Sequence, residues 1–293
     1  MEIAAEYRQG EGRRILPDEL RLGAAHLKVA DLDRAVAFYS EVIGLQLRER
    51  AEGIAYLGAG MDDLIVLHER PDVRRVSRHA GLYHVAIHFP SQLELARVAQ
   101  RILESRTPIE GASDHGTHEA IYLPDVDGNG LELAWDRQPS EWPNLADITA
   151  IAPRPLDMGG LFNLVSSSEP APGADPGTFI GHVHLHVGSV ADSKVFYRDL
   201  LGFDLITEID TAVFVSAGGF HHHLAFNTWQ GRGAPPAPDD AIGLEFWTIV
   251  LPAEDDVAEA RERLATGGVA TSEVDGGFEA ADPSGNRLRV TAG

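Results

Sequence analysis

Residues 24–47 read AAHLKVADLDRAVAFYSEVIGLQL, and residues 182–205 read HVHLHVGSVADSKVFYRDLLGFDL. The two stretches align without a gap, and each predicts a strand, a helix, a glycine that ends the helix and a second strand. Asp31 and Ser189 are predicted to cap the two helices at their N-termini. An internal repeat of this kind defines the structural unit of the chain.

Both copies continue into a predicted hairpin, over residues 54–67 and 212–226. Two further copies of the unit begin near residues 82 and 244, and each reaches its last strand through a D-x-x-G-N turn. We therefore predict an α+β fold made of four βαβββ modules with mixed, cupped sheets. A module of this size cannot bury its sheet alone, so the modules must pair.

The repeats divide the chain into two predicted domains of two modules each. The first domain covers residues 21–136 and the second covers residues 179–293, and a loose tail is expected over residues 1–20. The linker over residues 137–178 is rich in Pro, Ser, Ala and Asp. A short apolar helix is predicted within it, near residues 161–165.

The composition limits the classes of partner. The 293 residues include 45 acidic and 24 basic side chains, a net charge of −21, which argues against nucleic acid or an anionic membrane. The chain has no cysteine, so any metal must be bound by histidine and carboxylate. It has neither a membrane-length apolar run nor a signal-peptide core, and we expect a cytoplasmic homo-oligomer acting on a small molecule.

One carboxylate stands in an apolar strand. Residues 113–135 read SDHGTHEAIYLPDVDGNGLELAW, in which Glu132 lies between leucines. A buried, unpaired carboxylate is costly, so a partner is expected for Glu132, and a metal ion is one such partner. The alternative is that Glu132 lies on the solvent face of an amphipathic strand.

The four modules and this stretch resemble the vicinal oxygen chelate superfamily of glyoxalases, bleomycin-resistance proteins and extradiol dioxygenases. The nearest similarity is to the two-domain catechol 2,3-dioxygenases. Five residues match the spacing of the extradiol ring-cleavage signature, and these are His115, Tyr122, Asp125, Gly128 and Glu132. Ser113 and Val126 depart from it, Val126 by replacing the usual proline.

The resemblance implies a metal bound by two histidines and one carboxylate. The family's histidine position, five residues before the end of each module's first strand, is occupied by His84 and His182 in the central modules. The carboxylate is Glu132, whose predicted equivalents in the other modules are Val66, Leu224 and Arg289. Modules two and three would then share the metal site. The alternative pairing of modules one and two would need His26 in place of His182.

The resemblance also implies roles for residues around the metal. Two histidines and one carboxylate suit Fe(II), and Mn(II) accepts the same ligands. His222 is predicted as the acid/base, because strand alternation would place it on the same face as Leu224 and turn His221 and His223 away. His115 and Tyr122 are also predicted to be catalytic, and the predicted substrate-binding residues are His184, Asn227 and Trp229.

These features predict an extradiol dioxygenase that cleaves a small aromatic diol with O2. A glyoxalase-type isomerase or transferase is the first alternative, although such enzymes typically use a second carboxylate where Leu224 is predicted. A non-catalytic, resistance-type binding protein is the second. A hydroquinone-type diphenol in place of a catechol is a third reading.

Overall fold

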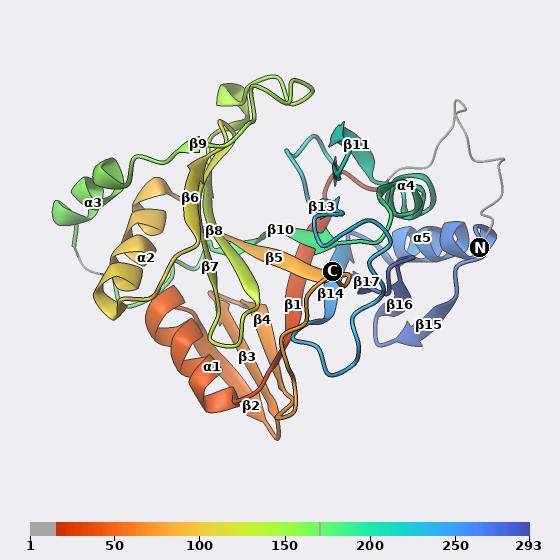
Figure 1. The fold of residues 1–293 in the computed structure, drawn as a ribbon, viewed down its shortest axis with the longest axis horizontal. Helices are drawn as coiled ribbons and strands as arrows, with labels where there is room; N and C mark the ends of the chain where they lie inside the picture. Colours follow the sequence, from red (N-terminus) through yellow and green to blue (C-terminus); the bar gives the residue numbers. More distant parts are fainter. Residues whose placement is uncertain (1–15, 170) are drawn as a thin grey trace.

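The computed structural model describes residues 16–169 and 171–293, and the four predicted modules of an α+β fold are confirmed (Figure 1). The first half contains β1 (Arg21–Val29), α1 (Leu32–Phe38), η2 (Tyr39–Ile43), β2 (Gln46–Ala51), β3 (Ile54–Ala59), β4 (Asp62–Glu69), β5 (Gly81–His88), α2 (Gln92–Ser105), β6 (Gly111–Asp114), β7 (His118–Pro124) and β8 (Gly130–Asp136). The linker contains η3 (Pro139–Glu141), β9 (Arg154–Pro155) and α3 (Met158–Ser166). The second half contains β10 (Phe179–His186), α4 (Val190–Lys194), η4 (Val195–Leu201), β11 (Asp204–Ile209), β12 (Ala212–Ser216), β13 (Leu224–Asn227), β14 (Gly243–Leu251), α5 (Glu254–Thr266), β15 (Thr271–Val274), β16 (Gly277–Ala281) and β17 (Arg287–Ala292).

Each sheet takes one module from either half of the chain. One sheet has the order β11-β12-β13-β10-β5-β8-β7-β6-β9, which joins modules two and three. The other has the order β15-β16-β17-β14-β1-β4-β3-β2, which joins modules one and four. The central pairs β5–β10 and β1–β14 are both antiparallel. The predicted pairing of modules two and three is thus confirmed, and the linker separates halves of the chain rather than sheets.

The first helix of each half begins and ends as predicted. The side chains of Asp31 and Ser189 accept hydrogen bonds from backbone N–H groups at the helix starts. Each α-helix then widens into a π-helical turn and stops at a glycine, Gly44 with φ 93° and Gly202 with φ 108°. Glycine adopts this left-handed conformation without the strain that a Cβ would add.

The two modules of each half are linked by a buried tyrosine–aspartate contact. Tyr39 Oη donates to Asp125 Oδ2 over 3.1 Å, and Tyr197 Oη donates to Asp282 Oδ2 over 3.0 Å. In both D-x-x-G-N turns, the other carboxylate oxygen of the aspartate accepts backbone N–H groups of the turn. The repeated turn therefore has a structural function in both halves.

The linker is more ordered than its composition suggests. The predicted apolar helix is present as α3, which packs against α2, while β9 pairs with β6. Leu16 and Leu20 are buried, which differs from the loose tail expected over residues 1–20, and residues 1–15 of that tail lie outside the described residues. In the described part of the chain, no helix combines the length and the apolar character needed to cross a membrane.

Candidate metal centre

His84, Glu132 and His182 come together where β5, β8 and β10 lie side by side. Parallel pairing of β5 and β8 puts Ala86 opposite Glu132, and antiparallel pairing of β5 and β10 puts the same Ala86 opposite His182. His84 is two residues from Ala86 and therefore projects from the same face of the sheet. All three side chains are buried.

The ligand atoms of this triad converge on one point. His84 Nε2 and His182 Nε2 lie 3.0 and 3.1 Å from Glu132 Oε2, and 3.3 Å from each other. Ligands about 2.1 Å from a metal ion and at right angles to one another are about 3.0 Å apart. The spacing fits three ligands on one face of an octahedral ion, as in two-histidine, one-carboxylate iron sites.

The protonation of the triad also suits a cation. Burial opposes ionisation of Glu132, but His182 and His84, with a hydrogen bond from His118, hold the pKa of its carboxyl well below the usual range. Burial lowers the pKa of His182 to about 3, which exceeds the opposing effect of Glu132. An ionised carboxylate and a neutral imidazole are the forms that bind metal.

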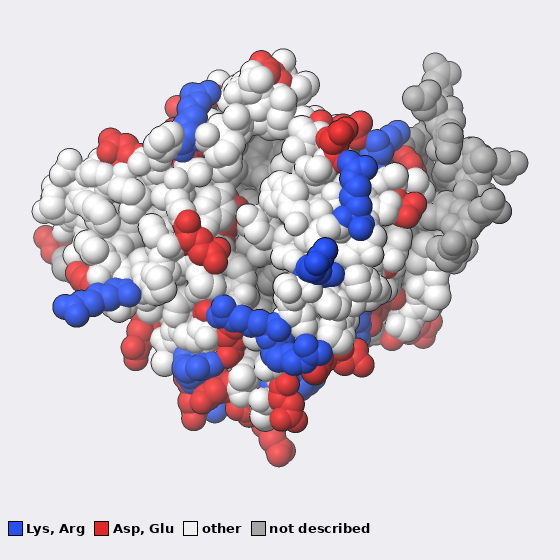
Figure 2. Space-filling view, in the orientation of Figure 1, with Lys and Arg blue, Asp and Glu red and all other residues white. Residues whose placement is uncertain are grey.

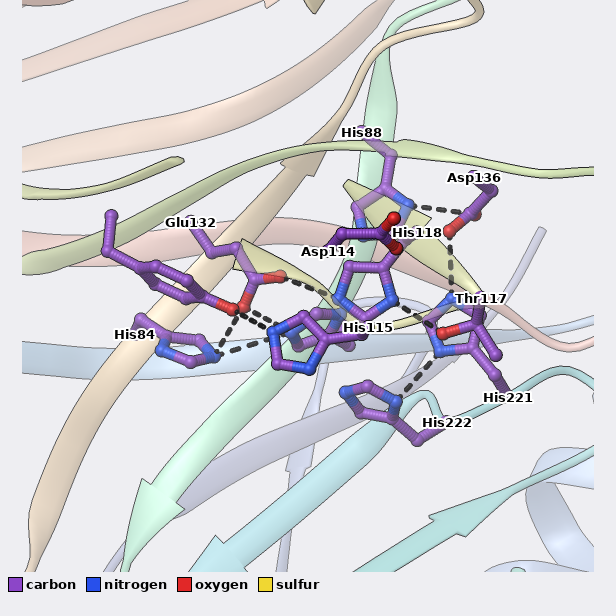
Figure 3. A network of polar contacts seen from close by, with 12 residues as sticks. His84, His88, Asp114, His115, Thr117, His118, Glu132, Asp136, His221 and His222 are labelled. Carbon is purple, nitrogen blue, oxygen red and sulfur yellow. Dashed lines mark hydrogen bonds and ion pairs between the residues drawn. The ribbon is translucent and has the colours of Figure 1, made fainter. Parts of the chain in front are cut away.

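His118, which sequence reasoning missed, orients the carboxylate. Its Nε2 donates to Glu132 Oε1 over 3.0 Å, and its Nδ1 accepts from the Thr117 hydroxyl over 2.8 Å (Figure 3). The oxygen of Glu132 that faces the histidines is therefore left free for a metal. The spacing within β7 could have identified His118, because it is four residues before Tyr122 in the same strand and therefore lies on the same face.

A second group, of buried His88 and His221 around partly buried Asp136, adjoins the triad. Asp136 accepts hydrogen bonds from His88 Nδ1 over 2.9 Å and from His221 Nε2 over 2.8 Å (Figure 3). Burial alone would lower the pKa of His88, but the Asp136 carboxylate raises it. His88 and Asp136 lie four residues beyond His84 and Glu132 in their strands, a periodicity that could have identified them.

These contacts determine the tautomer of His222. Burial lowers the pKa of His221 to about 4, so this ring is neutral at pH 7. Because its Nε2 hydrogen is donated to Asp136, its Nδ1 carries a lone pair and accepts the Nδ1 hydrogen of His222, 2.8 Å away. Neutral His222 therefore keeps a lone pair on Nε2, and its ring lies 4.1 Å from that of His182, centroid to centroid.

The predicted register at Leu224 is wrong by one residue. Ala225 in β13 pairs with His184, just as Glu132 in β8 pairs with Ala86, so Ala225 occupies the position equivalent to Glu132. Leu224, one residue earlier, packs in the hydrophobic core. The loop between the paired residues Val215 and Leu224 has eight residues (216–223), whereas the equivalent loop between Leu57 and Ile65 has seven (58–64).

The longer loop also changes the predicted directions of His221, His222 and His223. Residues 221–223 precede β13 and do not alternate as a strand does. His221 and His222 both line the cavity, so the prediction that His221 turns away is wrong. His223 instead accepts a hydrogen bond from the Ser216 hydroxyl over 2.9 Å.

A cavity of about 580 Å³ opens onto the triad. Its lining includes four of the remaining predicted residues, which are His115, Tyr122, His184 and Trp229. Tyr122 lies directly opposite Glu132 across the hairpin, as predicted, and its hydroxyl is 2.8 Å from His115 Nε2. Burial raises the pKa of Tyr122 well above its usual value, with Glu132 adding to the shift, so the hydroxyl stays protonated. Asn227 is not part of the lining, because it lies behind His184 and donates to its Nε2 over 2.8 Å.

The matching face of the other sheet is filled by side chains. His26 Nδ1 lies 2.9 Å from His68 Nε2, and the His26 ring stacks on Phe246 with centroids 3.9 Å apart. The guanidinium of Arg289 lies 3.6 Å from the centre of the same phenyl ring. His26 is thus in a separate cluster from the triad.

Comparison with known proteins places this architecture in a family. The family model described as Glyoxalase/Bleomycin resistance protein/Dioxygenase superfamily matches residues 21–133 and again residues 179–290. The chain therefore belongs to this superfamily. Among curated proteins it is 37% identical over 275 residues to a catechol-2,3-dioxygenase of Bacillus subtilis (strain 168), which covers 91% of this chain and 95% of that protein. Within the superfamily, the chain is a catechol-2,3-dioxygenase-like enzyme.

Solved structures agree with the fold. A candidate dioxygenase from Bacillus subtilis subsp. subtilis str. 168 superposes with a TM-score of 0.62 at 12% identity, over 93% of this chain and 85% of that one. Glyoxalase I from Zea mays superposes with a TM-score of 0.57 at 17% identity, over 94% and 92% of the two chains. At these identities the similarity concerns the fold alone.

Proposed function

We propose that this chain is an extradiol dioxygenase, which adds O2 to a catechol beside its hydroxyl groups, with Fe(II) held by His84, Glu132 and His182. The facial arrangement of these three ligands carries the proposal. Bound Fe(II) would supply adjacent open positions for a diol and O2. Mn(II) is the alternative metal. A cytoplasmic location and a homo-oligomeric state remain predictions.

The side chains around the triad are suited to moving and holding protons. His222 is proposed to accept a proton from a diol hydroxyl at Nε2, because its Nδ1 hydrogen is already donated to His221. The protonated hydroxyl of Tyr122, paired with His115, can donate to a substrate oxygen. The glyoxalase-type alternative would call for a carboxylate at the position of Ala225.

Oxygen consumption tests the proposal. Protein loaded with Fe(II) under anaerobic conditions and then mixed with catechol and air is expected to consume O2 and form a yellow, ring-opened product. Absence of O2 uptake with catechols and hydroquinones, despite bound iron measured by elemental analysis, would refute it.

A matched pair of variants tests the ligands. His182→Ala is expected to lose iron and activity, whereas His26→Ala, in the filled cluster of the other sheet, is expected to retain both. Iron retained by His182→Ala and lost by His26→Ala would contradict the assignment of the triad.

A further inference from the structure

The lining of the cavity above the triad combines the histidines and other polar groups of the site with a set of apolar side chains. The segment of the linker between β8 and β9 (Figure 1) contributes Leu145, Ile148 and Ile151 to this lining. Ile209 and Trp229, from the opposite side, also line it and are partly exposed, at 39% and 50%. Exposed apolar side chains gathered at a cavity are typical of a surface that binds an apolar group.

The lining of the cavity contains carboxylates as its acidic groups. Among the described residues that line it there is no lysine or arginine. Glu110 is exposed in the lining, and its backbone N–H donates to the carbonyl of Tyr122 over 2.7 Å, which holds it beside the hairpin of the site. Figure 2 shows the hollow in this face of the molecule with largely uncharged walls. An anionic substituent would enter without a cation to pair with.

The cavity is also larger than a single aromatic ring requires. A volume of about 580 Å³ is within the range of roughly 300–1,000 Å³ that holds drug-sized ligands. A diol ring placed at the triad therefore leaves space between the linker and β11 for a substituent of similar size.

We propose that this site selects catechols that carry a bulky, uncharged apolar substituent and discriminates against catechols that carry a carboxylate. The proposal rests on the extradiol function proposed above. The apolar substituent lies between the linker residues, represented by Ile148, and Trp229 on the opposite wall. Glu110, which also lines the cavity, repels a carboxylate that enters it.

Binding and turnover of three probes test the selectivity. Catechol, 4-phenylcatechol and 3,4-dihydroxybenzoate are titrated calorimetrically into Fe(II)-loaded protein without oxygen, and kcat/KM is measured for each in air. We expect 4-phenylcatechol to bind at least about tenfold more tightly than catechol, since the phenyl group leaves water. We expect 3,4-dihydroxybenzoate to bind more weakly than catechol. Equal affinities, or the reverse order, would overturn the proposal.

Two variants, each with a matched control, assign the preference to the named residues. Ile148→Ser should lower the ratio of phenylcatechol to catechol affinity severalfold, whereas Leu103→Ser, exposed on α2 outside the cavity, should leave the ratio unchanged. Glu110→Lys should raise the affinity for 3,4-dihydroxybenzoate severalfold, and Glu104→Lys, the same charge change on α2, should not. Effects of equal size in variant and control would show that the cavity residues do not determine selectivity.

The two readouts separate this proposal from the function on which it rests. If the probes bind in the expected order but none consumes O2, the dioxygenase function fails while the selectivity stands. If all three are cleaved with equal kcat/KM and bind equally, the function stands and the selectivity fails.

Discussion

His118 is expected to increase metal affinity although it does not reach the metal position. Its single hydrogen bond to Glu132 Oε1, 3.0 Å long, acts on a carboxylate whose side chain is only 2% exposed, so water cannot readily replace it. A hydrogen bond to a charged group contributes about 1.5–3 kcal/mol. His118→Phe removes the donor and should therefore weaken metal binding by about 10- to 100-fold, the range found for residues that orient metal ligands.

Titration with Mn(II), with the free ion followed by electron paramagnetic resonance, measures this affinity without turnover. His118→Gln retains a side-chain N–H donor and is expected to recover part of the loss. His79→Phe serves as the control, because His79 is a histidine whose Nδ1 contacts the backbone carbonyl of Ser77. Circular dichroism checks that each variant is folded. Unchanged Mn(II) affinity in folded His118→Phe, or equal losses in the Phe and Gln variants, would refute the reasoning.

Two further predictions concern stability. Asp136→Asn breaks the ion pair between partly buried Asp136 and fully buried His88, and should cost about 3 kcal/mol in metal-free protein. The pKa of His88 is raised in the folded protein, so its contribution to stability is complete below about pH 6.5 and is lost as the pH rises. The pKa of Asp136 is lowered, so its contribution to stability is present above about pH 4 and is lost in acid. Urea unfolding should thus show a larger difference at pH 5.5 than at pH 9, and equal differences would contradict the ion pair. Gly130→Ala would place a Cβ 1.9 Å from the Tyr83 carbonyl oxygen, and should lower stability by about 2–3 kcal/mol and weaken Mn(II) binding. In the control variant Gly111→Ala the new Cβ meets no atom within 4 Å, and stability should change by less than about 0.5 kcal/mol. Similar stabilities for these two glycine variants would refute the close approach of β5 and β8.

Much of the fold could be predicted because the chain repeats its own unit. Four copies of one pattern can be compared with each other, and their periodicity defines strands, helices and the glycines that end them. The same comparison singled out Glu132, the one acid among four equivalent positions, and His84 in the same module. Local spacing carries this information, since alternation in a strand decides which side chains share a face.

Contacts between modules could not be obtained in this way. The family resemblance favoured His182 over His26, but the contact that brings His182 beside His84 is the pairing of β10 with β5, between the two halves of the chain. The wrong register at Leu224 comes from the loop before β13, which has one residue more than its equivalent in the first module. A loop has no regular periodicity from which the added residue could be detected.

The sequence by itself determined the repeated module, its capped helices and the residue types of a metal site without cysteine. The tertiary structure confirmed which modules share a sheet. It alone showed that His118 and Asp136 support the triad and that the linker contributes to the lining of the cavity. The physical reason is that periodicity within one element follows from backbone geometry, whereas these arrangements depend on pairing and packing between segments distant in sequence.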